Sequence, residues 1–151
     1  MPPLLPTDCL RSERLKRLLA DWTKRCPAHG FPARRDFDPI DLKYVLGRLT
    51  LLEVLRDPAN FKFRVHATEA ARYLGYDLTG RTVDDYPSPE YRDYTKRLYQ
   101  EAVRSARPCV VQESAIIGGR ALRWEALILP LAADGKTIDM LMVGLDFGRT
   151  G

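Results

Sequence analysis

The sequence predicts an α+β fold, a five-stranded antiparallel sheet with a helical insert between its second and third strands. Five segments have the length and apolar patterning of strands: 49–56, 60–67, 109–117, 120–131 and 137–147. Turn residues lie between the paired segments, namely Asp57-Pro58-Ala59, Gly118-Gly119 and the Asp134-Gly135 pair. The stretch from Thr68 to Arg107 instead carries helix signals, so it separates a two-stranded hairpin from a three-stranded meander.

An amphipathic helix is predicted close to the N-terminus. Thr7 or Asp8 can cap its start, and Pro27 ends it. Its apolar side chains form one stripe about 100° wide, which contains Leu15, Leu18, Leu19, Trp22 and Cys26. Such a stripe must be covered, either by the protein's own sheet or by the same helix of a second chain. We expect a homodimer, with Leu15, Leu18, Leu19 and Trp22 in its interface.

Further helix signals follow along the chain. Asp38-Pro39 starts a short helix that ends at Gly47. Within the insert, Thr68 can cap a turn that ends at Gly75. Ser88-Pro89-Glu90 combines a cap, a first-turn proline and a first-turn acid, and therefore predicts the longest helix of the insert.

The strands differ in how many of their faces are apolar. In the second strand, Phe61, Phe63 and Val65 alternate with polar residues, which predicts that His66 lies on the polar face. Segments 127–131 and 141–145 are apolar on both faces, as is typical of central strands that are covered on both sides. We expect the insert to cover one side of the sheet and the N-terminal helix the other.

Composition is that of an ordinary globular protein, with 45% hydrophobic and 29% charged residues and a net charge of +4. The basic excess lies in residues 1–35, but no base-reading motif or interleaved aromatics accompany it, so nucleic-acid binding is not expected. The longest apolar runs have the length of strands, so no membrane span is predicted. The start of the chain lacks a basic leader and an apolar signal segment, which favours a cytoplasmic location.

No cofactor, metal or catalytic constellation is predicted. The three cysteines form no CxxC pair, which disfavours a disulfide framework or a zinc site. His29 lies in a loop and His66 on a polar face, so neither suggests a haem ligand, and no Asn-Cys-Arg flavin motif is present. With only these two histidines, no Ser/His/Asp triad can be proposed, and we do not expect an enzyme.

Several motifs occur in a familiar order: Asp36-Phe37-Asp38-Pro39, 61–65, 77–81, Arg123-Trp124-Glu125 and 129–131. Together they resemble a family of short single-domain bacterial PAS proteins, long described only as a domain of unknown function. The resemblance covers residues 12–147 and implies the PAS strand order, a pocket between sheet and central helices, sensing or protein interaction, and often dimers. One departure is Ala67-Thr68, where the family tends to have Gly-Thr. We divide the chain into an N-terminal helix and loop, 1–35, and a PAS-like domain, 36–151.

Aromatic residues of the insert and the facing sheet suggest a ligand pocket. We predict that it is lined by Tyr73, Tyr91, Tyr94, Leu98, Arg123 and Trp124, with Arg123 and Tyr94 as its polar contacts. The alternative is that these side chains simply pack a solid core. The sequence thus favours a non-enzymatic sensory or regulatory module that signals through an unknown protein partner and can bind a small molecule. An enzyme acting in the same pocket and a ligand-free structural adaptor are the other two hypotheses.

Overall fold

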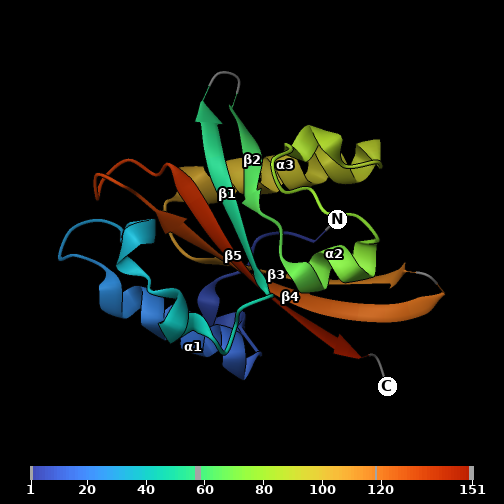
Figure 1. The fold of residues 1–151 in the computed structure, drawn as a ribbon, viewed down its shortest axis with the longest axis horizontal. Coiled ribbons are helices and arrows are strands. Elements are labelled where there is room, and N and C mark those ends of the chain that lie inside the picture. The colour runs from blue at the N-terminus through green and yellow to red at the C-terminus, as the bar shows by residue number, and fades with distance from the viewer. Residues whose placement is uncertain (1, 57–58, 118, 150–151) are drawn as a thin grey trace.

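The computed structural model describes residues 2–56, 59–117 and 119–149. Five antiparallel strands form one sheet in the order β2-β1-β5-β4-β3 (Figure 1). The strands are β1 (Leu49–Arg56), β2 (Ala59–Val65), β3 (Cys109–Ile117), β4 (Arg120–Leu131) and β5 (Met140–Arg149). The α+β fold class is confirmed, and so is the PAS-like order, since the last strand lies beside the first.

Three strands have the predicted bounds, and two do not. β1, β3 and β4 agree with the prediction, whereas β2 ends two residues early and β5 begins at Met140 instead of Thr137. The late start of β5 arises because the Asp134 carboxylate accepts the backbone N–H groups of Lys136 and Thr137, at 2.8 and 2.7 Å, and holds them in the loop. The predicted turn residues Asp57, Pro58 and Gly118 lie outside the described residues, while Gly119 has the expected positive φ of 77°.

A β-bulge near the end of β2 changes which side chains face inward. Phe63 pairs with Leu52 and Val65 with Leu51, so Arg64 is an extra residue without a register partner on β1. This extra residue reverses the alternation: Val65 is 39% exposed, and His66 is only 4% exposed. The prediction that His66 lies on the polar face is therefore wrong.

Helix α1 (Glu13–Arg25) begins later than predicted. Thr7 and Asp8 form a 3₁₀ turn, and the N-cap is Ser12, whose Oγ accepts the N–H of Leu15 at 3.1 Å. The Glu125 carboxylate of β4 sets this start, because it accepts the backbone N–H groups of Arg11 and Ser12 at 2.9 and 2.7 Å. The cap thus depends on a contact between residues far apart in the sequence.

The apolar stripe of α1 packs on the protein's own sheet. Leu15 and Leu18 are fully buried, and the Trp22 indole N–H donates to the Pro130 carbonyl at 2.9 Å. Leu19 is partly buried against the same cluster. The predicted dimer interface through Leu15, Leu18, Leu19 and Trp22 is therefore wrong in its location, because these side chains already lie inside one chain.

The helical insert covers the opposite face of the sheet (Figure 1). It contains α2 (Thr68–Leu74), which ends at Gly75 with φ 86°, and α3 (Pro89–Ser105). As predicted, Ser88 caps α3, and its hydroxyl accepts the Tyr91 N–H at 3.2 Å. Two apolar clusters result, one between α1 and the sheet and one between the insert and the sheet. The second cluster does not fill all of its space.

Candidate functional site

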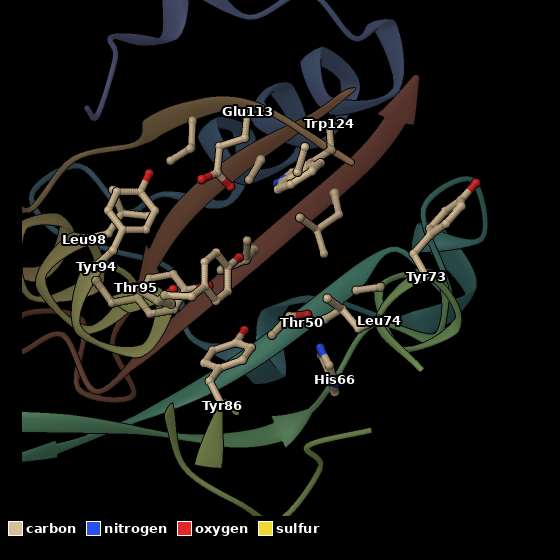
Figure 2. Close-up of a pocket in the computed structure, with 18 of the residues that line it drawn as sticks. Thr50, His66, Tyr73, Leu74, Tyr86, Tyr94, Thr95, Leu98, Glu113 and Trp124 are labelled. Carbon is tan, nitrogen blue, oxygen red and sulfur yellow. The ribbon is translucent and has the colours of Figure 1, made fainter. Parts of the chain in front are cut away.

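A cavity of about 350 Å³ lies between α2, α3 and the insert-facing surface of the sheet (Figure 2). Five of the six residues predicted for the pocket line it: Tyr73, Tyr91, Tyr94, Leu98 and Trp124. Arg123 does not, because neighbouring residues of a strand point to opposite faces and Trp124 takes the inward position. The expected role of Arg123 as a polar contact in the pocket is therefore wrong.

Much of the cavity wall is aromatic. Tyr86 packs edge-on against Phe63 at 5.8 Å and against Tyr91 at 5.0 Å, and Tyr91 lies 6.2 Å from Tyr94 between ring centres. These edge-on contacts fix the orientation of the rings. Burial raises the pKa of the Tyr86, Tyr91 and Tyr94 hydroxyls, so each remains protonated and able to donate a hydrogen bond.

One carboxyl group points into the cavity. Glu113 of β3 lies directly opposite Trp124 of β4 in the strand register, and its side chain projects between Trp124 and Tyr94 (Figure 2). Burial raises the pKa of the Glu113 carboxyl, and the neighbouring Trp124 and Tyr94 side chains oppose that shift. The Tyr94 hydroxyl itself donates to the Pro2 carbonyl at 2.7 Å, which brings the start of the chain to this side of the site.

Thr95 places a second polar group, a hydroxyl, in the cavity wall. The Thr95 hydroxyl of α3 is buried and makes no hydrogen bond within the described part of the chain. Tyr91 is its neighbour on α3, and the Thr95 side chain lowers the pKa of Tyr91 against the larger effect of burial. A buried hydroxyl without a partner is costly, so a polar group placed beside Thr95 would be stabilising.

The bulge on β2 adds a histidine to the cavity wall. His66 Nδ1 accepts the Leu78 backbone N–H at 3.0 Å, so the proton of the neutral ring is on Nε2. Burial lowers the pKa of His66, and the Asp77 carboxylate partly opposes this effect. His66 therefore adds a neutral ring to the wall and not a positive charge.

Comparison with known families now identifies the fold. A sequence model described as a PAS domain matches residues 10–145. The chain belongs to the PAS domain family. The match begins at Leu10, so it includes α1 as well as the sheet and insert. A comparison with curated proteins finds no match.

PAS domains are generally sensory or regulatory and non-enzymatic, and they often mediate protein interactions. In the described ranges of this PAS domain, no three His, Cys, Asp or Glu side chains are grouped so that they could hold a metal ion. Among the same residues, no helix is both long and apolar enough to span a membrane.

Glu113, Thr95 and His66 are among the polar residues of this PAS cavity that the sequence analysis missed. For Glu113 a signal existed, because it shares the inward face of β3 with Val111 and Ala115. Thr95 could have been found from its helical spacing to Tyr91 and Leu98. His66 had no such signal, since its inward orientation depends on the bulge.

Proposed function

We propose that this PAS domain is a sensory or regulatory module that binds a small organic molecule in the insert-facing cavity. The observation that carries this proposal is the unpartnered Thr95 hydroxyl, buried in an aromatic cavity of about 350 Å³. Pockets for small molecules typically have about 300–1,000 Å³, apolar walls and a few polar groups. A ligand-free adaptor has no need for a cavity of this kind, because close packing of the same surfaces would stabilise the fold more.

Native mass spectrometry combined with a thermal-shift screen tests ligand binding. Protein purified under mild conditions should carry a non-covalent small molecule, or should gain several degrees in melting temperature with members of a fragment library. The Leu98→Trp variant, which fills the cavity, should lose both effects. The adaptor hypothesis would be supported instead by two results together. The mass spectrum would show no bound ligand, and no library member would produce a thermal shift that is lost in Leu98→Trp.

We further infer that ligand binding is passed on through contact with another protein chain. Support comes from the family, since PAS domains often mediate protein interactions. With the α1 stripe buried in one chain, a homodimer would have to use a different surface. Sedimentation over a range of concentrations, with and without a bound ligand, checks the proposed homodimer, and a monomer under all conditions would require a different protein as partner.

A further inference from the structure

The charged side chain that lines the cavity is acidic. Glu113 contributes a carboxyl group, whereas no lysine or arginine of the described residues lines the cavity. His66 is the other group there that can change charge near neutral pH, and its burial favours the uncharged ring. A ligand in this space therefore meets a negative group with no described lysine or arginine beside it, although the amino group of the chain favours the charged form of Glu113.

Glu113 differs from Glu125, a second acid of the sheet, in that the side chains of Trp124 and Tyr94 are the main groups that favour its charged form. Glu125, on the other face of the sheet, accepts hydrogen bonds from the Arg11 and Ser12 backbone and from Gln112 Nε2. Glu113 forms no ion pair with a described lysine, arginine or histidine, and the nearby Tyr94 hydroxyl donates to Pro2. A half-buried carboxylate of this kind is stabilised when a cation binds next to it.

The rings around Glu113 favour a cation as well. Trp124 lies on one side of the carboxylate and Tyr94 on the other, and Tyr91 contacts Tyr94 at a ring-centre distance of 6.2 Å (Figure 2). The faces of aromatic rings carry partial negative charge and attract ammonium groups within about 6 Å of the ring centre. A carboxylate among aromatic rings thus matches the charge and shape of an organic ammonium ion.

We propose that the cavity takes an organic amine whose ammonium group pairs with Glu113 and whose apolar body lies among the rings and Leu98. The Thr95 hydroxyl supplies a second polar contact for the same molecule. This inference rests on the proposed function, since it assigns a chemical class to the ligand of that cavity. It also predicts that a carboxylate on the same apolar body is rejected, because it would face Glu113.

Three matched probes test the assignment by calorimetry or ligand-observed NMR: 2-phenylethylamine, 2-phenylethanol and 3-phenylpropionate. The amine should bind about tenfold tighter than the alcohol, because its ammonium group can form a charged hydrogen bond with Glu113, and the acid should bind weakest. Glu113→Gln should reduce amine affinity about tenfold and leave the alcohol within about twofold. Glu101→Gln removes the same charge from an exposed position on α3 and should change none of the three affinities.

The possible outcomes separate this inference from the proposed function. If the alcohol or the acid binds as tightly as the amine, or if Glu113→Gln leaves amine binding unchanged, the amine assignment is overturned while the binding cavity stands. The amine assignment is also overturned, and the binding cavity stands, if none of the three probes binds while other library members bind the wild type and do not bind Leu98→Trp. If no compound of any charge binds, both proposals fail. The ranking of the probes on the wild-type protein decides the matter even if Glu113→Gln does not fold.

Discussion

His66 and Leu78 are joined by a buried hydrogen bond, in which the imidazole Nδ1 accepts the backbone N–H of Leu78 at 3.0 Å. The bond connects the residue just after β2 to the loop that follows α2. It needs a neutral imidazole, because a doubly protonated ring has no acceptor left. This contact therefore depends on pH.

We expect the folding stability to fall as the pH drops below 6.5, the ordinary pKa of histidine. Burial depresses the pKa of His66 in the folded state, so its contribution is fully present above 6.5 and is lost as the pH falls through the lower folded pKa. Urea unfolding of the wild type and of His66→Asn at several pH values checks this. His66→Asn should remove this part of the pH dependence, whereas the exposed His29→Asn should retain it.

Two threonines should respond in opposite ways to replacement by valine. Thr95→Val removes a buried hydroxyl that has no partner among the described residues, so the free energy of unfolding should stay unchanged or rise by up to about 1 kcal/mol. Thr50→Val removes the acceptor of the Ala67 N–H, a bond of 3.0 Å, and should cost about 1–3 kcal/mol. Equal losses in chemical denaturation would show that Thr95 has a partner after all.

Filling the cavity should cost little stability. Leu98→Trp extends a side chain that lines the empty space, so we expect a loss below about 1 kcal/mol together with the loss of ligand-induced thermal stabilisation. Ala102→Leu, on the same helix, is a control that adds volume where the packing is closed, and overpacking there should cost about 1–3 kcal/mol. A similar penalty for both variants would mean that the space around Leu98 is solid core.

The contact between α1 and the sheet depends on a glycine. A Cβ atom on Gly144 would lie 2.6 Å from Leu18 Cδ2 and 2.9 Å from Leu15 Cδ2. Gly144→Ala should therefore destabilise the fold by about 1–3 kcal/mol, as measured by thermal or chemical unfolding. Gly148→Ala, on the same strand, meets its nearest atom at 3.9 Å and should cost less. Equal effects would show that strand propensity matters more than the contact with the leucines.

Local chemistry explains which parts of the fold could be predicted. Ser88 and Gly75 act on neighbouring residues, so the end of α2 and the start of α3 were correctly predicted. The start of α1 was wrong because it depends on Glu125, more than a hundred residues away. The inward position of His66 was missed for a related reason, since a bulge is defined by pairing between strands.

The cavity itself was only partly predictable. The amphipathic residues of the insert indicated its position, and Tyr91, Tyr94 and Leu98 do line it. Arg123 was assigned to the wrong face although it directly precedes Trp124, an error that strict alternation along β4 would have avoided. Whether such residues enclose a space or pack solidly depends on how α3 is placed against the sheet, which no local pattern specifies.

The register of β3 and β4 places one residue pair on the cavity face of the sheet and the adjacent pair on the α1 face. Glu113 and Trp124 face the cavity, while the adjacent Gln112 and Glu125 bond to each other at 2.8 Å on the side of α1. Neighbouring residues of a strand are only about 3.3 Å apart along the chain. Any shift of this backbone that accommodates a molecule next to Glu113 must also move the carboxylate that holds Arg11 and Ser12. One backbone layer thus separates the cavity from the contacts that hold the first turn of α1.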